Sequence, residues 1–295
     1  MLTPLSGPYL VPFEREHLPT SLATQPPEDA PGKKACKKSL KEESKHLDEL
    51  QRRLYAEDRR SLLLIFQAMD AAGKDSTIRA VMKGVDPSGC QVHAFKQPSS
   101  EELDHDFLWR TARRLPERGR IGIFNRSYYE ETLVVRVHPE YLQAQRIDIP
   151  DNLDDLWQQR FEAIRQHEKH LAENGTVIMK FWLNVSPEAQ RERFLSRLEE
   201  PEKHWKFSLR DVEERQHWNA YMQAYHETLA ETSRPWAPWY AIPADNKPFM
   251  RWQVAKLIRK TLERMDPQYP EVDADAVDNF VAMRQRLKHE APSDS

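Results

Sequence analysis

An apolar run that leads into a turn of small residues and a glycine–lysine pair is the feature that most constrains this chain. Residues 61–67 (SLLLIFQ) have the pattern of a strand buried on both faces, and residues 74–84 have that of a helix. The turn between them is AMDAAG, residues 68–73, followed by Lys74. Consecutive backbone N–H groups and a helix N-terminus favour an anion at such a place. The sequence therefore predicts a phosphate-binding loop on a buried strand.

Four further apolar runs alternate with helical patterns. The other strands are predicted over residues 92–95, 120–124, 176–185 and 239–243. Helices are predicted over residues 37–60, 101–115, 153–173, 187 onwards, 208–232 and 247–265, and Ser208 and Asp211 have the spacing of a capping box. Strands separated by helices imply right-handed crossovers. We therefore expect one three-layer α/β/α domain with a parallel central sheet.

Composition divides the chain into three segments. Residues 1–36 hold seven of the 21 prolines without a regular period, which predicts an extended arm that lies on a neighbour or is partly mobile. Residues 37–266 form the expected main domain, and residues 267–295 a polar peripheral tail. Within the domain, residues 191–215 have many charges and few apolar residues, so they are expected to form a helical lid outside the sheet layers.

The overall charge and the cysteine content exclude several classes of protein. Lys and Arg number 44 and Asp and Glu 47, a net charge of −3 that argues against a general nucleic-acid coat protein. Cys36 and Cys90 are too few for a disulfide framework or a cysteine metal site. No apolar stretch approaches the ~20 residues of a membrane span. We expect a cytoplasmic enzyme with neither nucleic-acid nor membrane partners.

The loop departs from the G-x-x-x-x-G-K-[ST] pattern in ways that bear on metal binding. Ala68 replaces the first glycine, and Asp75 follows Lys74 where a hydroxyl residue is usual. A carboxylate at Asp70 would repel phosphate unless Mg²⁺ lies between them, so Asp70 is a predicted metal ligand. The alternative is that Asp70 only forms the turn or caps the helix. The predicted phosphate-binding residues of the loop are Ala71, Ala72, Gly73, Lys74, Asp75, Ser76 and Thr77.

A second polar motif follows the strand predicted over residues 120–124. Asn125 is neutral, so a hydrogen bond to a metal-bound water is easier to defend there than direct metal ligation. Arg126 is predicted to hold an acceptor phosphate with its planar guanidinium, the alternative being a surface arginine at a strand end.

The lid segment is rich in cations. Pro201 divides it between two predicted helices, and Trp205 and Phe207 lie among the basic residues. Such a segment fits a hinged lid over a polyanion, which excludes water and stabilises charge in the transition state. A solvated helix face carries equal weight for this segment considered alone, and His204 is expected to be lid surface. The basic residues, apart from this histidine, are Arg191, Arg193, Arg197, Lys203, Lys206, Arg210 and Arg215.

Three blocks in order resemble the polyphosphate kinase 2 family. They are residues 67–74 (QAMDAAGK), residues 123–138 (IFNRSYYEETLVVRVH) and residues 201–215 (PEKHWKFSLRDVEER), and residues 237–244 (APWYAIPA) also fit. The resemblance implies a P-loop kinase fold, with inorganic polyphosphate, AMP, ADP and ATP as reaction partners. It also implies Mg²⁺ as the cofactor, with Mn²⁺ as a substitute. Asn instead of Asp at position 125, with the continuation NRSYYEE over residues 125–131, is similar to the branch of the family that phosphorylates both AMP and ADP.

The resemblance also assigns roles to residues. It implies catalytic roles for Asp70, Lys74 and Arg126, with Asp70 as the metal ligand. Polyphosphate binding is assigned to the loop and to Arg136, Arg197, Lys203, Lys206 and Arg210. Nucleotide binding is assigned to Asn125, Arg126, Ser127 and Tyr128.

The expected reaction is reversible, Mg²⁺-dependent phosphoryl transfer from polyphosphate that makes ADP from AMP and ATP from ADP. One alternative is an ATP-dependent nucleotide kinase of the same fold, which needs fewer lid cations. Another is a non-catalytic module for polyanions or nucleotides, which Ala68 and Asn125 keep open. The sequence fixes neither the preferred acceptor nor the base, direction, chain length or homo-oligomeric state.

Overall fold

The computed structural model describes residues 1–290, and five parallel strands form its centre. The strands are β1 (Ser61–Gln67), β2 (Cys90–Ala94), β3 (Ile121–Asn125), β4 (Thr176–Asn184) and β5 (Trp239–Pro243), in the order β2-β3-β1-β4-β5. Leu64 of β1 lies opposite Ile123 on one side and Met179 on the other. Every residue of β1 is buried, as a strand in the middle of a covered sheet requires.

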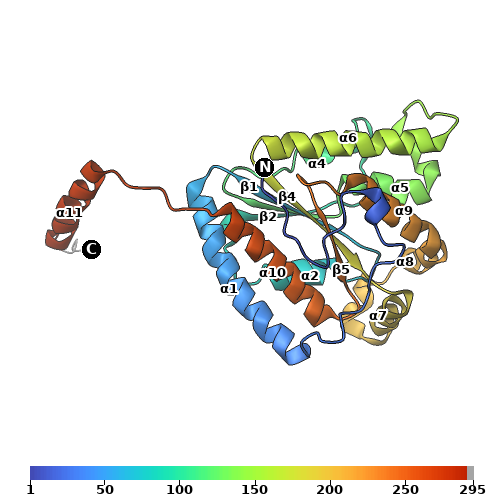
Figure 1. Cartoon of the computed structure of the whole chain (residues 1–295), viewed down its shortest axis with the longest axis horizontal. Coiled ribbons are helices and arrows are strands. Elements are labelled where there is room, and N and C mark those ends of the chain that lie inside the picture. Colours follow the sequence, from blue (N-terminus) through green and yellow to red (C-terminus); the bar gives the residue numbers. More distant parts are fainter. Residues whose placement is uncertain (291–295) are drawn as a thin grey trace.

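Helices cover both faces of the sheet (Figure 1). On one face α1 (Lys33–Glu57) packs along α10 (Lys247–Met265), which also contacts α2 (Lys74–Val81). On the other face lie α6 (Leu153–Glu173), α9 (Trp218–Thr232) and the short α5 (Val134–Val137). The predicted three-layer fold is confirmed in these layers. Because the strands are parallel, their carboxyl ends meet at one edge of the sheet, where ligands of open α/β folds bind.

The predicted helix over residues 101–115 was wrong. The structure has two short helices there, α3 (Ser100–Leu103) and α4 (Trp109–Ala112). The Asp106 carboxylate accepts a hydrogen bond from the Leu108 N–H over 2.9 Å, so a new turn starts between them. The other short elements are η1 (Arg15–His17), η2 (Pro87–Gly89), η3 (Tyr128–Thr132) and η4 (Pro139–Gln145).

The predicted lid segment, residues 191–215, lies within α7 (Pro187–Glu199), η5 (Pro201–Lys206), α8 (Leu209–Glu213) and η6 (Glu214–His217). Pro201 separates α7 from η5, as the sequence predicts. The predicted continuous helix over residues 208–232 was wrong, because the chain breaks at η6 and Ser208 makes no side-chain cap. The Glu214 carboxylate instead accepts hydrogen bonds from His138 and Tyr221 at 2.8 Å each, contacts that local spacing does not reveal.

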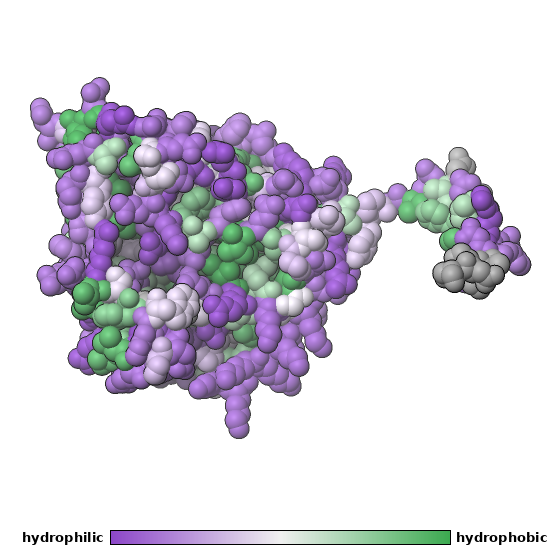
Figure 2. All heavy atoms as spheres, turned by 180° about the vertical axis from the view of Figure 1, so that it is seen from behind, coloured by the Kyte–Doolittle hydropathy of each residue, from purple (hydrophilic) through white to green (hydrophobic). Residues whose placement is uncertain are grey.

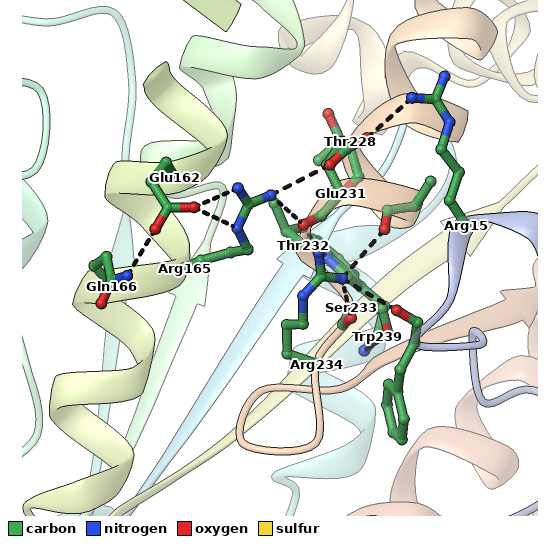
Figure 3. A network of polar contacts seen from close by, with 12 residues as sticks. Arg15, Glu162, Arg165, Gln166, Thr228, Glu231, Thr232, Ser233, Arg234 and Trp239 are labelled. Atoms are coloured by element: carbon green, nitrogen blue, oxygen red, sulfur yellow. Dashed lines mark hydrogen bonds and ion pairs between the residues drawn. The ribbon is translucent and has the colours of Figure 1, made fainter. Parts of the chain in front are cut away.

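The N-terminal arm lies on its own domain. The Ala241 N–H donates to the Tyr9 carbonyl over 2.8 Å, and the Val11 N–H donates to the Trp239 carbonyl over 2.9 Å. These bonds place the arm against the free edge of β5. Farther along, Arg15 pairs with Glu231 at the end of α9, beside Arg165 of α6 (Figure 3).

The C-terminal helix α11 (Ala274–His289) stands apart from the body on an extended segment (Figure 1). Its exposed side chains include Val277, Phe280 and Val281, and Figure 2 shows hydrophobic atoms along it. The predicted tail over residues 267–295 thus contains a helix, and its last five residues lie outside those described. Within residues 1–290, every helix is too short or too polar to span a bilayer.

Candidate active site

The phosphate-binding loop joins β1 to α2 at the carboxyl edge of the sheet. Its backbone takes positive φ at Ala71 (58°) and at Gly73 (105°), and α2 begins directly at Lys74. The left-handed conformation at Gly73 suits a residue without a Cβ atom. The loop thereby presents the first turn of α2, with its N–H groups, to the space above the sheet.

Lys74 lies inside this loop. Its side chain is buried, and Nζ donates to the Ala68 carbonyl over 2.7 Å. Burial lowers the pKa of Lys74, and the nearby Arg126 guanidinium lowers it further. The ammonium group is thus held where a bound phosphate would stabilise its charge.

Helix α7 holds the loop from the opposite side. Gln190 Nε2 donates to the Asp70 carbonyl over 2.8 Å, and Arg193 Nη1 donates to the Ala72 carbonyl over 2.7 Å. Arg193 also reaches the Ala244 carbonyl after β5, at 2.5 Å. The start of the lid is therefore fixed to the loop by side-chain donors on backbone carbonyls.

Residues at the end of β3 meet the loop. Arg126 Nη2 donates to Asp70 Oδ1 over 2.9 Å, and Asn125 Nδ2 donates to Asp75 Oδ1 over 2.7 Å. The carboxylate of Glu130 and then that of Asp70 raise the pKa of Arg126, which stays a cation. Loop and strand end thus form one polar cluster, as the sequence predicts for these residues.

Two cavities of different chemistry open on either side of this cluster. The aromatic cavity, about 340 Å³, is lined by Tyr141, Tyr221 and Tyr225 together with carboxylates that include Glu130. The cationic cavity, about 690 Å³, is lined by basic side chains and by the loop. Its basic residues are Lys74, Lys96, Arg126, Arg193, Arg197, Lys203, Lys247 and Arg251. Both cavities are lined by Met69, Asp70, Lys96, Arg126 and Asp211.

The basic side chains in the cationic cavity act on one another. Burial lowers the pKa of Lys247 to about 8, with further contributions from Arg193 and Arg251. Within the lid, Arg197 Nη1 lies 3.3 Å from Asp211 Oδ2, and Lys203 forms an ion pair with Glu200. A cavity in which cations depress one another's protonation is suited to a ligand with many negative charges.

Most of the predicted site residues come together here. The cationic cavity is lined by Asp70, Ala71, Gly73, Lys74, Asp75, Ser76, Asn125, Arg126, Arg197 and Lys203, and the aromatic cavity by Arg210. Ala72 of the loop and Thr77 of α2 are buried and are not among the lining residues of either cavity. Lys206 lies in η5, where the structure describes only its backbone.

Three predicted residues lie elsewhere. Arg136 forms an ion pair with Glu227 of α9, and its guanidinium lies 5.9 Å from the ring centres of Trp157 and Phe161. Ser127 and Tyr128 are buried below the turn after β3, and the Tyr128 hydroxyl donates to Glu168. The geometry gives no support to direct ligand contacts for these three side chains.

Sequence reasoning missed Lys247 and Arg251, which reach the cationic cavity from the start of α10. Asn246 caps this helix by accepting from the Phe249 N–H over 3.2 Å. Two cations in the first turns of a helix are unfavourable with respect to its dipole. This unusual placement was the only feature of the sequence that could have marked Lys247 and Arg251 as site residues. Tyr221 and Tyr225 gave no such signal, because they read as ordinary core residues of a helix.

The fold and the site define a P-loop phosphotransferase. The defining features are a strand–loop–helix with an enclosed lysine, an arginine at the end of the neighbouring strand, and a cationic lid. Residues 31–270 match the family model of polyphosphate kinase 2. The chain belongs to the polyphosphate kinase 2 family, and it is an enzyme of polyphosphate–nucleotide phosphoryl transfer.

Similar proteins agree with this assignment. The chain is 53% identical over 249 residues to the ADP-polyphosphate phosphotransferase of Rhodopseudomonas palustris, covering 84% of this chain and 86% of the relative. It is 44% identical over 240 residues to the AMP/ADP-polyphosphate phosphotransferase of Meiothermus ruber, covering 81% and 86%. The crystal structure of polyphosphate kinase 2 from Arthrobacter aurescens TC1 superposes with a TM-score of 0.81 at 36% identity, covering 92% and 97%. The predicted family and fold are confirmed.

Proposed function

We propose that the protein transfers the terminal phosphoryl group of inorganic polyphosphate to AMP and to ADP, making ADP and ATP, in a reversible reaction. The observation that carries this proposal is the meeting of two unlike cavities at Asp70 and Arg126. A nucleoside needs aromatic surface and a few hydrogen-bonding groups, whereas a polyphosphate chain needs cations. The nucleoside part therefore belongs in the aromatic cavity and the polyphosphate in the cationic cavity.

The residues divide the work of in-line transfer. The loop N–H groups and Lys74 hold the transferring phosphoryl group, and Arg126 positions the acceptor phosphate. A terminal phosphate oxygen of the nucleotide forms the new P–O bond while the bond to the rest of the chain breaks, and the shortened chain leaves with the bridging oxygen. The attacking oxygen is already ionised near neutral pH, so no strong general base is assigned.

The donor set near the loop fits Mg²⁺, with Mn²⁺ as a substitute. Among residues 1–290 there is no group of three or more His, Cys, Asp or Glu side chains that would hold a metal by themselves. Asp70 instead faces both cavities, and Mg²⁺ is typically held by one or two carboxylates together with substrate phosphates. An ion held there would neutralise charge on the phosphate oxygens. The Asn125 amide donates to Asp75, so we assign to Asn125 at most a hydrogen bond to a water molecule bound to the metal ion.

Acceptance of both AMP and ADP is the narrower part of the proposal. The Meiothermus ruber relative is named for both nucleotides and the Rhodopseudomonas palustris relative for ADP. The resemblance of residues 125–131, which begin with Asn125 at the end of β3, to the dual-acceptor branch supports this part of the proposal. Because adenine nucleotides are cytoplasmic metabolites, we place the reaction in the cytoplasm.

The test is to incubate the purified protein with Mg²⁺ and long-chain polyphosphate, with AMP and ADP in separate reactions, and to follow the products by chromatography. Product from both acceptors supports the full proposal. Product from ADP alone keeps the polyphosphate donor and overturns acceptance of AMP. Transfer from ATP to a nucleotide, without any transfer from polyphosphate, overturns the proposed donor.

A further inference from the structure

Arg126 has a backbone conformation that its own side chain disfavours. Its φ is +64°, in the left-handed region where a Cβ atom is crowded. Its N–H donates to the Phe66 carbonyl at the end of β1 over 3.1 Å. One hydrogen bond to a neighbouring strand does not fix a turn, and residues in such conformations persist where the surroundings over-determine them. The chain continues from Arg126 into η3, where the Ser127 hydroxyl accepts from the Tyr129 N–H and the Ser127 carbonyl accepts from the Glu130 N–H, each over 3.2 Å.

Two buried tyrosines directly after the turn are tied to a single carboxylate oxygen. The hydroxyls of Tyr128 and Tyr129 donate to Glu168 Oε1 of α6 over 2.9 and 2.8 Å. Lys180 Nζ of β4 lies 2.7 Å from Glu168 Oε2 and donates to the Tyr129 hydroxyl over 2.7 Å. Glu168 and Lys180 are both fully buried, so within residues 1–290 they face one another and the polar groups of this network instead of water.

The network is anchored on two further elements. Lys180 Nζ donates to the Thr232 carbonyl at the end of α9 over 2.8 Å. The Thr232 hydroxyl accepts from Trp239 Nε1 of β5 over 2.9 Å. The Trp239 ring lies 4.8 Å from that of Tyr129. Elements η3, α6, β4, α9 and β5 thus converge beneath the turn that carries Arg126.

We propose that Glu168 and Lys180 are positioning residues, which hold η3 through the two tyrosine hydroxyls and so keep Arg126 and Glu130 directed into the aromatic cavity. Glu130 follows Tyr129 in the chain, and its Oε1 accepts from Gln67 Nε2 over 2.9 Å. A single carboxylate with two tyrosine donors fixes both rings in direction, which an apolar contact of the same volume does not. The inference rests on the proposed role of Arg126.

Stability alone is a poor explanation for this network. A buried ion pair is often no more stabilising than well-packed apolar side chains of similar volume. The surrounding core is apolar and aromatic, so such a replacement would fit the site. If the network has a purely structural role, breaking it should change only the stability of the protein. If it positions Arg126, breaking it should also change the kinetic constants for the nucleotide.

The experiment compares Glu168→Gln and Tyr129→Phe with the control Glu43→Gln, which breaks the ion pair between Glu43 of α1 and Arg259 of α10. The melting temperature of each protein is measured first. The kcat values and the KM values for nucleotide and polyphosphate are then measured at one temperature well below the lowest melting temperature. We expect Glu168→Gln to lower kcat/KM for the nucleotide about ten- to hundredfold, mainly through KM, with the polyphosphate KM within about twofold. Tyr129→Phe, which keeps the ring, should change the same constant less, and the control should lower only the melting temperature.

A double-variant cycle tests the route through Arg126. If Glu168 acts through this arginine, adding Glu168→Gln to Arg126→Lys costs less than about twofold beyond the arginine change alone. The inference is overturned if the losses of kcat/KM in the two single variants multiply in the double variant. It is also overturned if the nucleotide KM is unchanged in both Glu168→Gln and Tyr129→Phe. Normal kinetics in Arg126→Lys alone would instead overturn the proposed role of Arg126, so the two failures are distinguishable.

Discussion

Arg126 Nη2 and Asp70 Oδ1 lie 2.9 Å apart, which joins the end of β3 to the phosphate-binding loop across the point where the two cavities meet. Each group has a proposed partner in the loaded enzyme. The arginine would bind a phosphate of the acceptor, and the carboxylate would bind the metal ion. Their contact satisfies both charges in the ligand-free protein. Substrate binding must therefore exchange this ion pair for two others, at a small electrostatic cost.

Lys74→Ala should abolish most of the activity with the fold retained. Loss of a preorganised cation at the transferring phosphate typically lowers kcat by about 10²–10³-fold, roughly 3–4 kcal/mol. The substitution also removes a buried charge, so the melting temperature should not fall sharply. The measurement is kcat with thermal unfolding, beside Lys83→Ala, which alters an exposed lysine just beyond α2. Retained activity in Lys74→Ala would remove this residue from the mechanism.

Asp70→Asn should raise the Mg²⁺ concentration needed for half-maximal activity, by about tenfold or more on loss of a charged ligand. The change also breaks the ion pair with Arg126, which the Arg126→Lys protein reports separately. The measurement is a Mg²⁺ titration of rate at saturating substrates, repeated with Mn²⁺. A titration curve that coincides with that of the unaltered protein would show that Asp70 is not the ligand.

Polyphosphate binding should weaken as the pH rises above about 8. The pKa of Lys247 is lowered from 10.5 to about 8 in the free protein, whereas a bound polyanion favours its charged form. Binding therefore takes up a proton in this range, and affinity falls with increasing pH. In Lys247→Arg the cation persists, so the polyphosphate KM should rise less steeply between pH 7 and 9.5 than in the unaltered protein, with Lys74, whose pKa is also lowered by burial, left to titrate in both. Parallel profiles for the two proteins would contradict this assignment.

The two cavities should be separable by substitution. Arg251→Ala removes a cation from the cationic cavity and should raise the polyphosphate KM several-fold, with the nucleotide KM unchanged. Tyr221→Ala removes a ring from the aromatic cavity and should do the reverse. Initial rates with each substrate varied in turn measure both constants. An equal effect of either variant on both KM values would argue against separate cavities.

The strands and the loop were predictable because their signals are local. The continuous apolar run over residues 61–67 forms β1 with the same bounds, and the strand predicted over residues 120–124 is shifted by one residue. The site residues Asp70 and Lys74 could be located because they come shortly after the end of β1, and Arg126 because it comes directly after the end of β3. Parallel pairing then brings them together without further information.

What local signals could not supply is the partner of each charged side chain. Arg136 was assigned to phosphate binding, yet it pairs with Glu227, 91 residues away. Lys247 enters the cationic cavity because α10 starts there, which depends on the packing of the whole sheet. The break at Glu214 likewise reflects its tertiary bond to His138.

The pairing of Tyr9 and Val11 with β5 has a practical consequence for handling the protein. An uncovered strand edge is a template for other chains, and proteins usually block such edges. Deleting residues 1–12 would leave both cavities with all their lining side chains and yet expose the backbone of β5. The defect of the shortened chain would then appear as light scattering and poor yield, while the molecules that stayed dispersed would keep their substrate affinities.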